Sequence, residues 1–247
     1  MKKIHYILLG LIVTVVTTIS VFGFKNTKIA TNNLEVEHKK ASSGYNYTLF
    51  LKNSLLMDVS LTRPSNNDNN ILLCIPGAYT DLQTLKVDGL YIDKGKVYNK
   101  DKINHSLGGA IKIIQGDCEI FPSGKGKLLT DSLIDHIVNK KGSLFQQIQM
   151  IEKGKGATYK DTKLFQRRAI VKLKGNKTAI IESFEHITLA AFTKDLLELG
   201  VIDALYTDMG SWDEGWYKDP ISGKVTTIGR IRTETEKQCN WVVFKVK

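Results

Sequence analysis

Residues 168–210 read RAIVKLKGNKTAIIESFEHITLAAFTKDLLELGVIDALYTDMG, and this stretch decides the fold. It opens with two apolar runs, at residues 169–173 and 178–183. The four residues between them, Lys-Gly-Asn-Lys at 174–177, are turn formers, and this arrangement predicts a β-hairpin.

The second half of the same stretch predicts a helix and a returning strand. Thr188 precedes apolar positions with helical spacing, and Gly200 follows them as a stop signal. The apolar run at 201–206 is short enough for a buried strand. A hairpin, a helix and a strand in this order are typical of an α+β domain.

The flanking sequence continues this pattern of short strands with few helices. Apolar spacing predicts helices over 131–140 and 144–151. Turn residues at 52–54 predict that the first two strands form a hairpin. We expect one domain over residues 45–247, with further strands at 45–51, 55–61, 71–75, 89–97, 110–114, 119–121 and 241–246.

The amino terminus has the pattern of a targeting segment. Lys2 and Lys3 precede an apolar run, and residues 1–24 therefore predict a signal peptide or a single membrane anchor. A buried first helix is the alternative, and the absence of carboxylates before Glu35 argues against it. Residues 25–44 are polar and without periodicity, which predicts a tether. We therefore expect an exported protein that is periplasmic, secreted or held at the cell surface.

The overall composition is that of a globular protein with a basic surface. The chain has 247 residues and a formal charge of +10, with 42% hydrophobic residues, which excludes a wholly disordered or polytopic membrane protein. The charge raises the question of nucleic-acid binding. However, the lysines are spread along the chain, and export would remove that partner. We expect no nucleic-acid partner and a solvated basic surface instead.

Cofactor and metal chemistry have no sequence signature here. The spacing of Cys74, Cys118 and Cys239 and of the five histidines fits no metal site, and no phosphate-binding or dinucleotide fingerprint occurs. We therefore expect neither a metal nor a cofactor. In an oxidising compartment a disulfide is one reading of the cysteines, and buried structural thiols are the other.

The strongest candidate for chemistry is the loop after the strand at 201–206. The strand delivers Asp208 to its end, and carboxylates and aromatic residues follow as far as Tyr217. Aromatic faces beside carboxylates suit a sugar, and glycosidic cleavage requires carboxylates as acid and base. The alternative is a turn in which Asp208 caps backbone amides.

Two arginines open the hairpin. An arginine at a strand entrance provides a planar two-point grip on a phosphate or carboxylate, and Arg168 is the candidate. A surface salt bridge is the alternative for Arg168 and the favoured reading for Arg167. Thr188 has the features of a helix N-cap.

The order of these motifs resembles the phosphodiester glycosidase family. The matching stretches are 75–80 and 89–92 in the first half, 168–210 in the second, and 216–217 and 240–244, which look most like its exported bacterial branch. The resemblance implies curved mixed β-sheets and hydrolysis of a sugar-1-phosphodiester. It also implies site residues, with Asp208 and Arg168 as catalytic groups and with Tyr79, Ser183, Thr188, Gly210, Ser211 and Trp212 as substrate-binding groups.

The chain departs from that family's pattern at two positions. Pro76 stands where the family often has Asn, and Met209 interrupts the usual Asp-Gly-Gly. The favoured hypothesis is an exported hydrolase of a sugar-1-phosphodiester or related glycosidic linkage, with a possible membrane association through the N-terminal segment. The alternative is a catalytically silent envelope module that binds glycans or anionic polymers.

Overall fold

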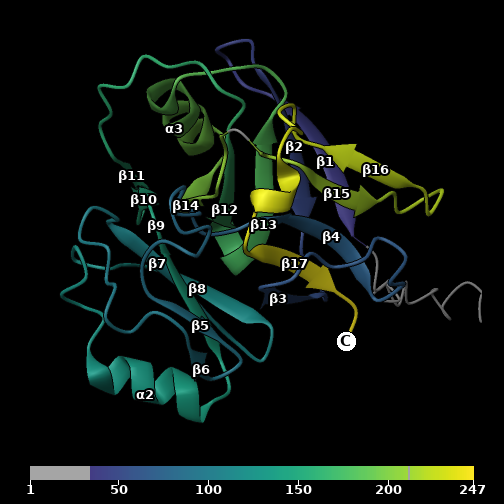
Figure 1. Cartoon of the computed structure of the whole chain (residues 1–247). Coiled ribbons are helices and arrows are strands. Elements are labelled where there is room, and N and C mark those ends of the chain that lie inside the picture. The colour runs from purple at the N-terminus through teal and green to yellow at the C-terminus, as the bar shows by residue number, and fades with distance from the viewer. Residues whose placement is uncertain (1–33, 211) are drawn as a thin grey trace, which may run out of the picture. The chain divides into compact units, whose positions relative to one another are not determined.

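The hairpin predicted at the start of 168–210 lies at the centre of the largest sheet (Figure 1). A computed structural model describes residues 34–210 and 212–247. The first sheet has seven strands, in the order β1 (Glu35–Lys40), β2 (Asn46–Leu51), β13 (Lys177–Ser183), β12 (Arg168–Leu173), β14 (Val201–Tyr206), β10 (Gln149–Glu152) and β11 (Lys155–Gly156). The predicted signal or anchor, residues 25–33 of the predicted tether and Ser211 lie outside the described residues.

Two five-stranded sheets complete the β-structure of the described ranges. The second sheet has the order β16 (Val225–Ile228), β15 (Gly215–Lys218), β4 (Ile71–Pro76), β17 (Trp241–Lys245) and β3 (Leu56–Ser60). The third has the order β6 (Lys96–Val97), β5 (Tyr91–Asp93), β9 (Ser143–Gln147), β7 (Gly109–Ile114) and β8 (Asp117–Pro122). Short 3₁₀ turns occupy Lys174–Asn176 and Thr235–Lys237.

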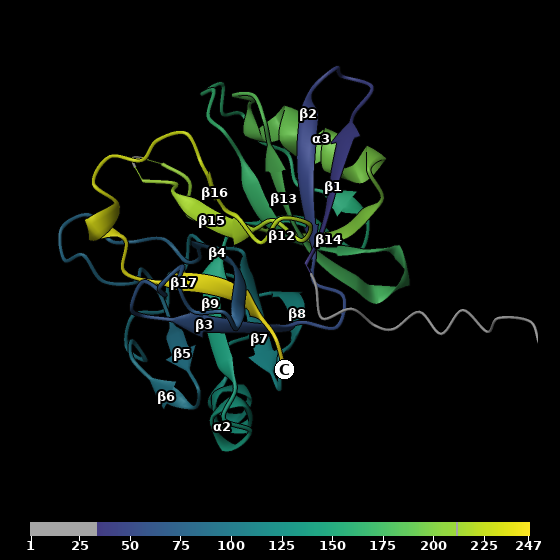
Figure 2. The ribbon, with the colours of Figure 1, turned by 90° about the vertical axis from the view of Figure 1, so that its right-hand side faces the viewer.

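The three sheets share one core, and helices cover two outer faces. One face of the first sheet packs on the second and third sheets through residues such as Ile170, Ile75 and Phe145. Its other face is covered by α3 (Leu189–Glu198), through Phe192 among others. Helix α2 (Asp131–Asn139) covers the third sheet at the far end of the domain from α3 (Figure 2). No helix within the described ranges is long and apolar enough to cross a membrane.

The resemblance predicted mixed sheets, but the recorded strand pairings of all three sheets are antiparallel. In the first sheet, the connection through α3 places β14 next to β12 rather than next to β13. Strand β12 therefore has an antiparallel neighbour on each side.

The helix predicted over 144–151 is wrong, because this segment forms β9 and β10. Every residue of β9 is buried, so its side chains pack on both faces of the third sheet and no polar face is needed. The buried amide of Gln146 is satisfied there, with Oε1 accepting from Leu90 N at 2.9 Å and Asn104 N at 3.0 Å. The spacing of apolar residues in this segment resembles that of a helix, but the segment forms strands because its residues are buried between other parts of the fold.

Two boundaries differ from the prediction at the start of the domain. Strand β1 lies within the range predicted as a tether, and it pairs with β2 along its whole length. Strands β2 and β3 do not form a hairpin, since they belong to different sheets. The turn between them is held by Lys52, whose N donates to Thr178 O at 2.9 Å.

A single amide side chain joins β17 to the loop that follows β4. Asn240 Oδ1 accepts from Ala78 N at 2.7 Å, and its Nδ2 donates to Ala78 O at 2.8 Å. Asn240 and Ala78 are both buried. Because both backbone groups of Ala78 depend on this side chain, Asn240 sets the course of residues 77–80.

We therefore expect Asn240→Ala to lower the free energy of unfolding by about 2–4 kcal/mol, because two buried backbone groups lose their partners. Urea denaturation followed by circular dichroism measures this change. Asn67→Ala, in an exposed loop, is the matched control and should change stability by less than about 0.5 kcal/mol. Equal midpoints for Asn240→Ala and the wild type would contradict the proposed role of this side chain.

Candidate functional site

The backbone around Asp208 is fixed by two neighbouring segments. Thr207 donates from N and from Oγ1 to Arg168 O, at 3.2 and 3.3 Å, which continues the pairing of β14 with β12. Asp208 N then donates to Gly77 O at 2.8 Å. The loop after β4 and the end of β14 therefore meet at Asp208.

The carboxyl group of Asp208 is almost completely buried, with 8% of the residue exposed. Its Oδ2 accepts from Thr80 N at 3.1 Å. Burial raises the pKa of Asp208 to about 7, while hydrogen-bonding groups of Thr80, Trp212 and Gln238 oppose that rise. A carboxyl group with a pKa near neutrality is a candidate acid or base, because it exchanges protons readily at physiological pH.

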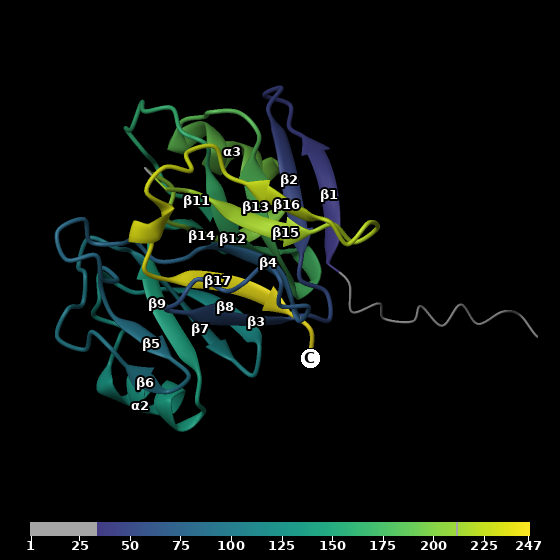
Figure 3. The ribbon, with the colours of Figure 1, turned by 45° about the vertical axis from the view of Figure 1, so that its right-hand side comes forward.

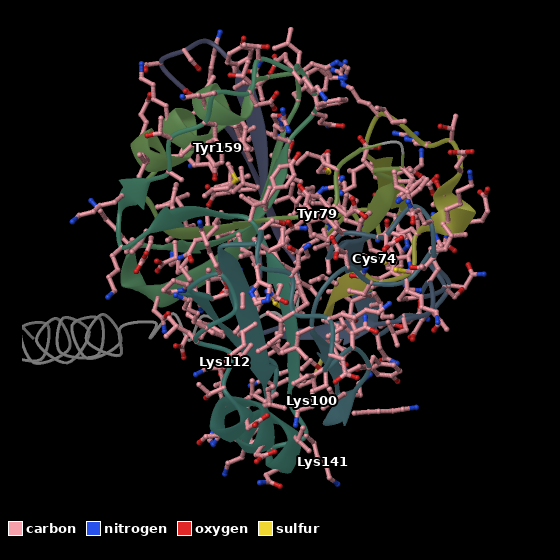
Figure 4. The ribbon with its side chains drawn as sticks, turned by 60° about the vertical axis from the view of Figure 1, so that its left-hand side comes forward. Cys74, Tyr79, Lys100, Lys112, Lys141 and Tyr159 are labelled. Carbon is pink, nitrogen blue, oxygen red and sulfur yellow. The ribbon has the colours of Figure 1, made fainter. Side chains whose placement is uncertain are left out.

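A pair of tyrosines lies beside Asp208. The rings of Tyr79 and Tyr206 meet edge to face with centroids 6.3 Å apart, and Tyr206 Oη accepts from Arg167 Nη1 at 3.0 Å. Burial raises the pKa of Tyr79 well above its ordinary value, and Tyr206 and Asp208 add to the rise. Tyr79 therefore keeps its phenolic proton. Figure 4 places it well away from Lys141, which lies beside helix α2.

The segment before β17 closes another side of this group. Cys239 Sγ lies 3.4 Å from Thr80 Oγ1, and Cys239 is only partly buried. Burial raises the pKa of the Cys239 thiol, and the charge of Asp208 adds to that rise. The thiol is therefore protonated near neutral pH. We call Asp208, Tyr79, Thr80, Trp212, Gln238 and Cys239 the Asp208 cluster.

Arg168 is fully buried and forms a different set of contacts. Its Nε donates to Glu182 Oε2 at 2.6 Å, Nη2 also contacts that carboxylate, and Nη2 donates to Asp213 O at 3.1 Å. Burial raises the pKa of Glu182, and the guanidinium of Arg168 opposes that rise. Among the described residues, the recorded partners of Arg168 do not include Asp208, and its Nη1 has no hydrogen-bond partner.

Arg167 was expected to make a surface salt bridge; the salt bridge is present, but the arginine is buried rather than at the surface. Only 5% of Arg167 is exposed. It makes an ion pair with Asp161 at 3.2 Å, and its Nε donates to Ile187 O at 3.1 Å. Through Tyr206 it also reaches the tyrosine pair. Arg167, rather than Arg168, is therefore the arginine recorded in contact with a neighbour of the Asp208 cluster.

The remaining predicted site residues have varied surroundings. Ser183 is fully buried, and its Oγ accepts from Arg167 N and donates to Glu185 O, both at 2.9 Å. Thr188 caps helix α3 by accepting from Ala191 N at 3.1 Å. Gly210 has open space where a side chain would begin. Ser183 and Thr188 therefore stabilise the local structure. Gly210, two residues after Asp208 in the sequence, is next to open space.

The two departures from the family pattern occupy ordinary structural positions. Pro76 ends β4 opposite Trp241 of β17. Met209 is buried and packs with Tyr79 and Tyr206 in the core beneath α3. Its side chain therefore fills space next to the Asp208 cluster, where a glycine would leave a void.

Several members of the cluster were missed by sequence reasoning. Thr80 lies in a motif that was recognised, but its hydrogen bond from the backbone N–H to Asp208 was not predicted. Gln238 and Cys239 come close only because β17 pairs with β4, a contact between distant parts of the chain. The described residues contain no group of three or more His, Cys, Asp or Glu side chains placed to hold a metal ion.

Comparison with known proteins shows the fold. No family model and no curated sequence matches the chain. The catalytic domain of zebrafish N-acetylglucosamine-1-phosphodiester alpha-N-acetylglucosaminidase, auto-inhibited by its pro-peptide, is similar with a TM-score of 0.58 and 14% identity, over 87% of this chain and 82% of that one. A hypothetical protein from Synechocystis has a TM-score of 0.51 and 10% identity, over 88% of this chain and 63% of that one.

The raised pKa of Asp208 predicts a pH effect on stability. The folded state holds the Asp208 proton up to about pH 7, whereas an unfolded aspartic acid loses it near pH 4. Between these values the folded state binds more protons, so stability falls as pH rises. We expect wild type to lose about 1–4 kcal/mol relative to Asp208→Asn between pH 4 and 7.

Urea denaturation of both proteins at several pH values measures this difference. Asp219→Asn is the control, because hydrogen bonds from Ser222 keep the pKa of that exposed turn residue below its ordinary value. Its stability should therefore follow that of wild type through this range. A pH-independent difference between wild type and Asp208→Asn would show that the pKa of Asp208 is the same in the folded and unfolded states, against the assigned pKa.

Proposed function

We propose that this protein is a hydrolase that cleaves the bond between a sugar and a phosphodiester-linked leaving group. The observation that carries the proposal is the Asp208 cluster, in which a buried carboxyl group with a pKa of about 7 lies beside tyrosine, tryptophan, threonine and glutamine side chains. The fold similarity to a phosphodiester glycosidase supports the same class of reaction.

Asp208 acts as the general base in the proposed reaction. Its carboxylate takes a proton from a water molecule as the water oxygen bonds to the anomeric carbon. The bond from that carbon to the phosphate oxygen breaks, and its electron pair leaves with the phosphate. A phosphate monoester has a second pKa near 6, so it leaves with little help from an acid. The products are the free sugar and the phosphate monoester.

The roles that we assign to Arg168 and Arg167 follow from their hydrogen bonds. Arg168 is neutralised by Glu182, so we assign it to positioning the loop after Asp208 through Asp213 rather than to gripping phosphate as the resemblance implied. Arg167 donates to Tyr206, which lies against Tyr79. In the proposal Arg167 therefore holds the tyrosine pair at the edge of the cluster, where the substrate sugar stacks.

One observation favours a second candidate function, a silent module that binds glycans or anionic polymers. Met209 is buried next to the cluster and only a small fraction of Asp208 is exposed, so the space for a sugar at Asp208 is limited. The two functions differ in turnover. If the protein binds a glycosyl phosphodiester but releases no sugar from it, the result favours the binding module over the hydrolase.

Export belongs to the proposal as well and rests on the pattern of residues 1–24. Cell fractionation of the full chain, with determination of the mature N-terminus, tests it. Recovery of the intact protein in the cytosol would exclude export.

Asp208→Asn should reduce the release of sugar from a panel of α- and β-glycosyl phosphodiesters by about 10²–10⁴-fold, because the base is lost. In the wild type, kcat/KM should rise with pH and level off above about 7, as Asp208 ionises. Asp219→Asn is the matched control and should keep full activity. Unchanged turnover in Asp208→Asn would exclude the role assigned to Asp208.

A further inference from the structure

A second pocket lies away from the Asp208 cluster, between the first and second sheets. Its cavity volume is about 750 Å³, and strands β1 and β2 form one wall while the β15–β16 ribbon forms the other. Figure 3 shows these four strands close together. Its lining includes neither Asp208 nor Arg168. The proposed hydrolysis does not use this pocket.

The rim of the pocket is strongly basic. Lys39, Lys40, Arg230 and Arg232 line it, and all four are exposed. Lys39 is paired with Glu37 at 2.7 Å, whereas the other three make no ion pair with any described residue. Unpaired cations around a hollow attract an anion.

The floor of the pocket has one carboxylate that is already neutralised. Glu182 lines the pocket and is the only acidic residue in its lining, but its Oε2 binds Arg168. Its Oε1 accepts from Gln166 Nε2 at 3.0 Å. The charge of Glu182 therefore does little to cancel the basic rim.

Gln166 supplies an acceptor that lacks a partner. It is buried, and its Nε2 donates both to Glu182 and to Ser183 O, the latter at 2.8 Å. Its Oε1 is buried without a hydrogen-bond partner among the described residues. Because a buried acceptor without a donor is costly, Gln166 Oε1 is a candidate acceptor for a ligand hydroxyl group.

An exposed aromatic ring stands at the mouth of the pocket. Phe184 is 63% exposed, and the guanidinium of Arg230 lies over its ring at 5.1 Å. Exposed phenylalanine offers a flat apolar surface next to a cation. That combination matches a sugar ring carrying a negative charge.

We propose that this pocket binds a negatively charged sugar. The anionic group contacts Arg230, Arg232 and Lys40, a hydroxyl donates to Gln166 Oε1, and the sugar ring packs on Phe184. The anion of such a sugar is a phosphate or a carboxylate, and the cations of the rim suit both. The site is independent of Asp208, and its binding is measured without turnover.

Calorimetric titration of the full chain with four probes tests the proposal. Glucose 1-phosphate and glucuronate distinguish the two anions, methyl glucoside lacks the charge, and inorganic phosphate lacks the ring. We expect at least one of the two anionic sugars to bind at least tenfold more tightly than methyl glucoside and inorganic phosphate. Raising the salt concentration to about 0.5 M should weaken that binding, because salt screens exposed charges.

Variants assign the binding to this pocket. Arg230→Gln and Lys40→Gln should each weaken binding of the anionic sugar about tenfold or more, which is the effect of losing a charge-assisted hydrogen bond. Phe184→Ala should weaken sugar binding and leave binding of inorganic phosphate unchanged. Lys125→Gln with Lys127→Gln is the control for a general charge effect, because it removes two charges, rather than one, from exposed lysines on a turn outside this pocket.

Three results would overturn the proposal. One is the absence of binding by both anionic sugars at millimolar concentration. Another is equal weakening by the Lys125/Lys127 control, which would show a general charge effect. The third is unchanged binding in Lys40→Gln and Phe184→Ala, two exposed positions whose circular dichroism should match that of the wild type.

Discussion

The buried charge of Arg168 is the constraint on which the rest of the structure depends. A guanidinium that is fully removed from water must be paired, and Glu182 on the adjacent strand is its partner. The same guanidinium holds the carbonyl of Asp213, whose carboxylate in turn accepts from Arg230 N at 3.1 Å and Ile231 N at 2.8 Å. Removing one member of such a pair costs about 3–5 kcal/mol. The hairpin, the loop after β14 and the segment after β16 are therefore joined by one buried network.

This network separates two regions with different chemistry. On one side, Asp208 is buried among neutral hydrogen-bonding groups, and burial raises its pKa with no cation among the main influences that oppose the rise. On the other side, Glu182 is charge-paired and borders a basic pocket. A carboxyl group poised near neutrality suits proton transfer, and a paired carboxylate beside free cations suits binding. The division of roles between the two regions follows from where the arginine lies.

Much of the second half of the fold could be predicted from local sequence. The hairpin, the helix capped by Thr188 and the strand leading to Asp208 all depend on contacts between near neighbours in the chain. The pairing of β17 with β4 could not be predicted, because its register depends on residues far apart in sequence. For the same reason Gln238 and Cys239 gave no signal. Strand β9 was not predicted, because its buried glutamines resemble the polar face of a helix in the sequence.

The orientation of Arg168 is the other limit of sequence reasoning. The apolar run of β12 is visible in the sequence, but the burial of Arg167 and Arg168 together depends on Tyr206, Glu182 and the loop carbonyls that receive them. These partners come from three separate segments. The sequence motifs therefore identified Arg167, Arg168 and Asp208 as candidates. Only the tertiary structure shows which of these side chains contact each other.

Hydrolysis of a glycosyl phosphodiester in ¹⁸O-labelled water tests the central claim most directly, because it reports which bond breaks. The mechanism predicts that mass spectrometry finds the label on the anomeric hydroxyl of the released sugar and none in the phosphate monoester. Label in the phosphate would show cleavage of the phosphorus–oxygen bond and would contradict the account. The absence of any release of sugar across α- and β-linked substrates would contradict it as well.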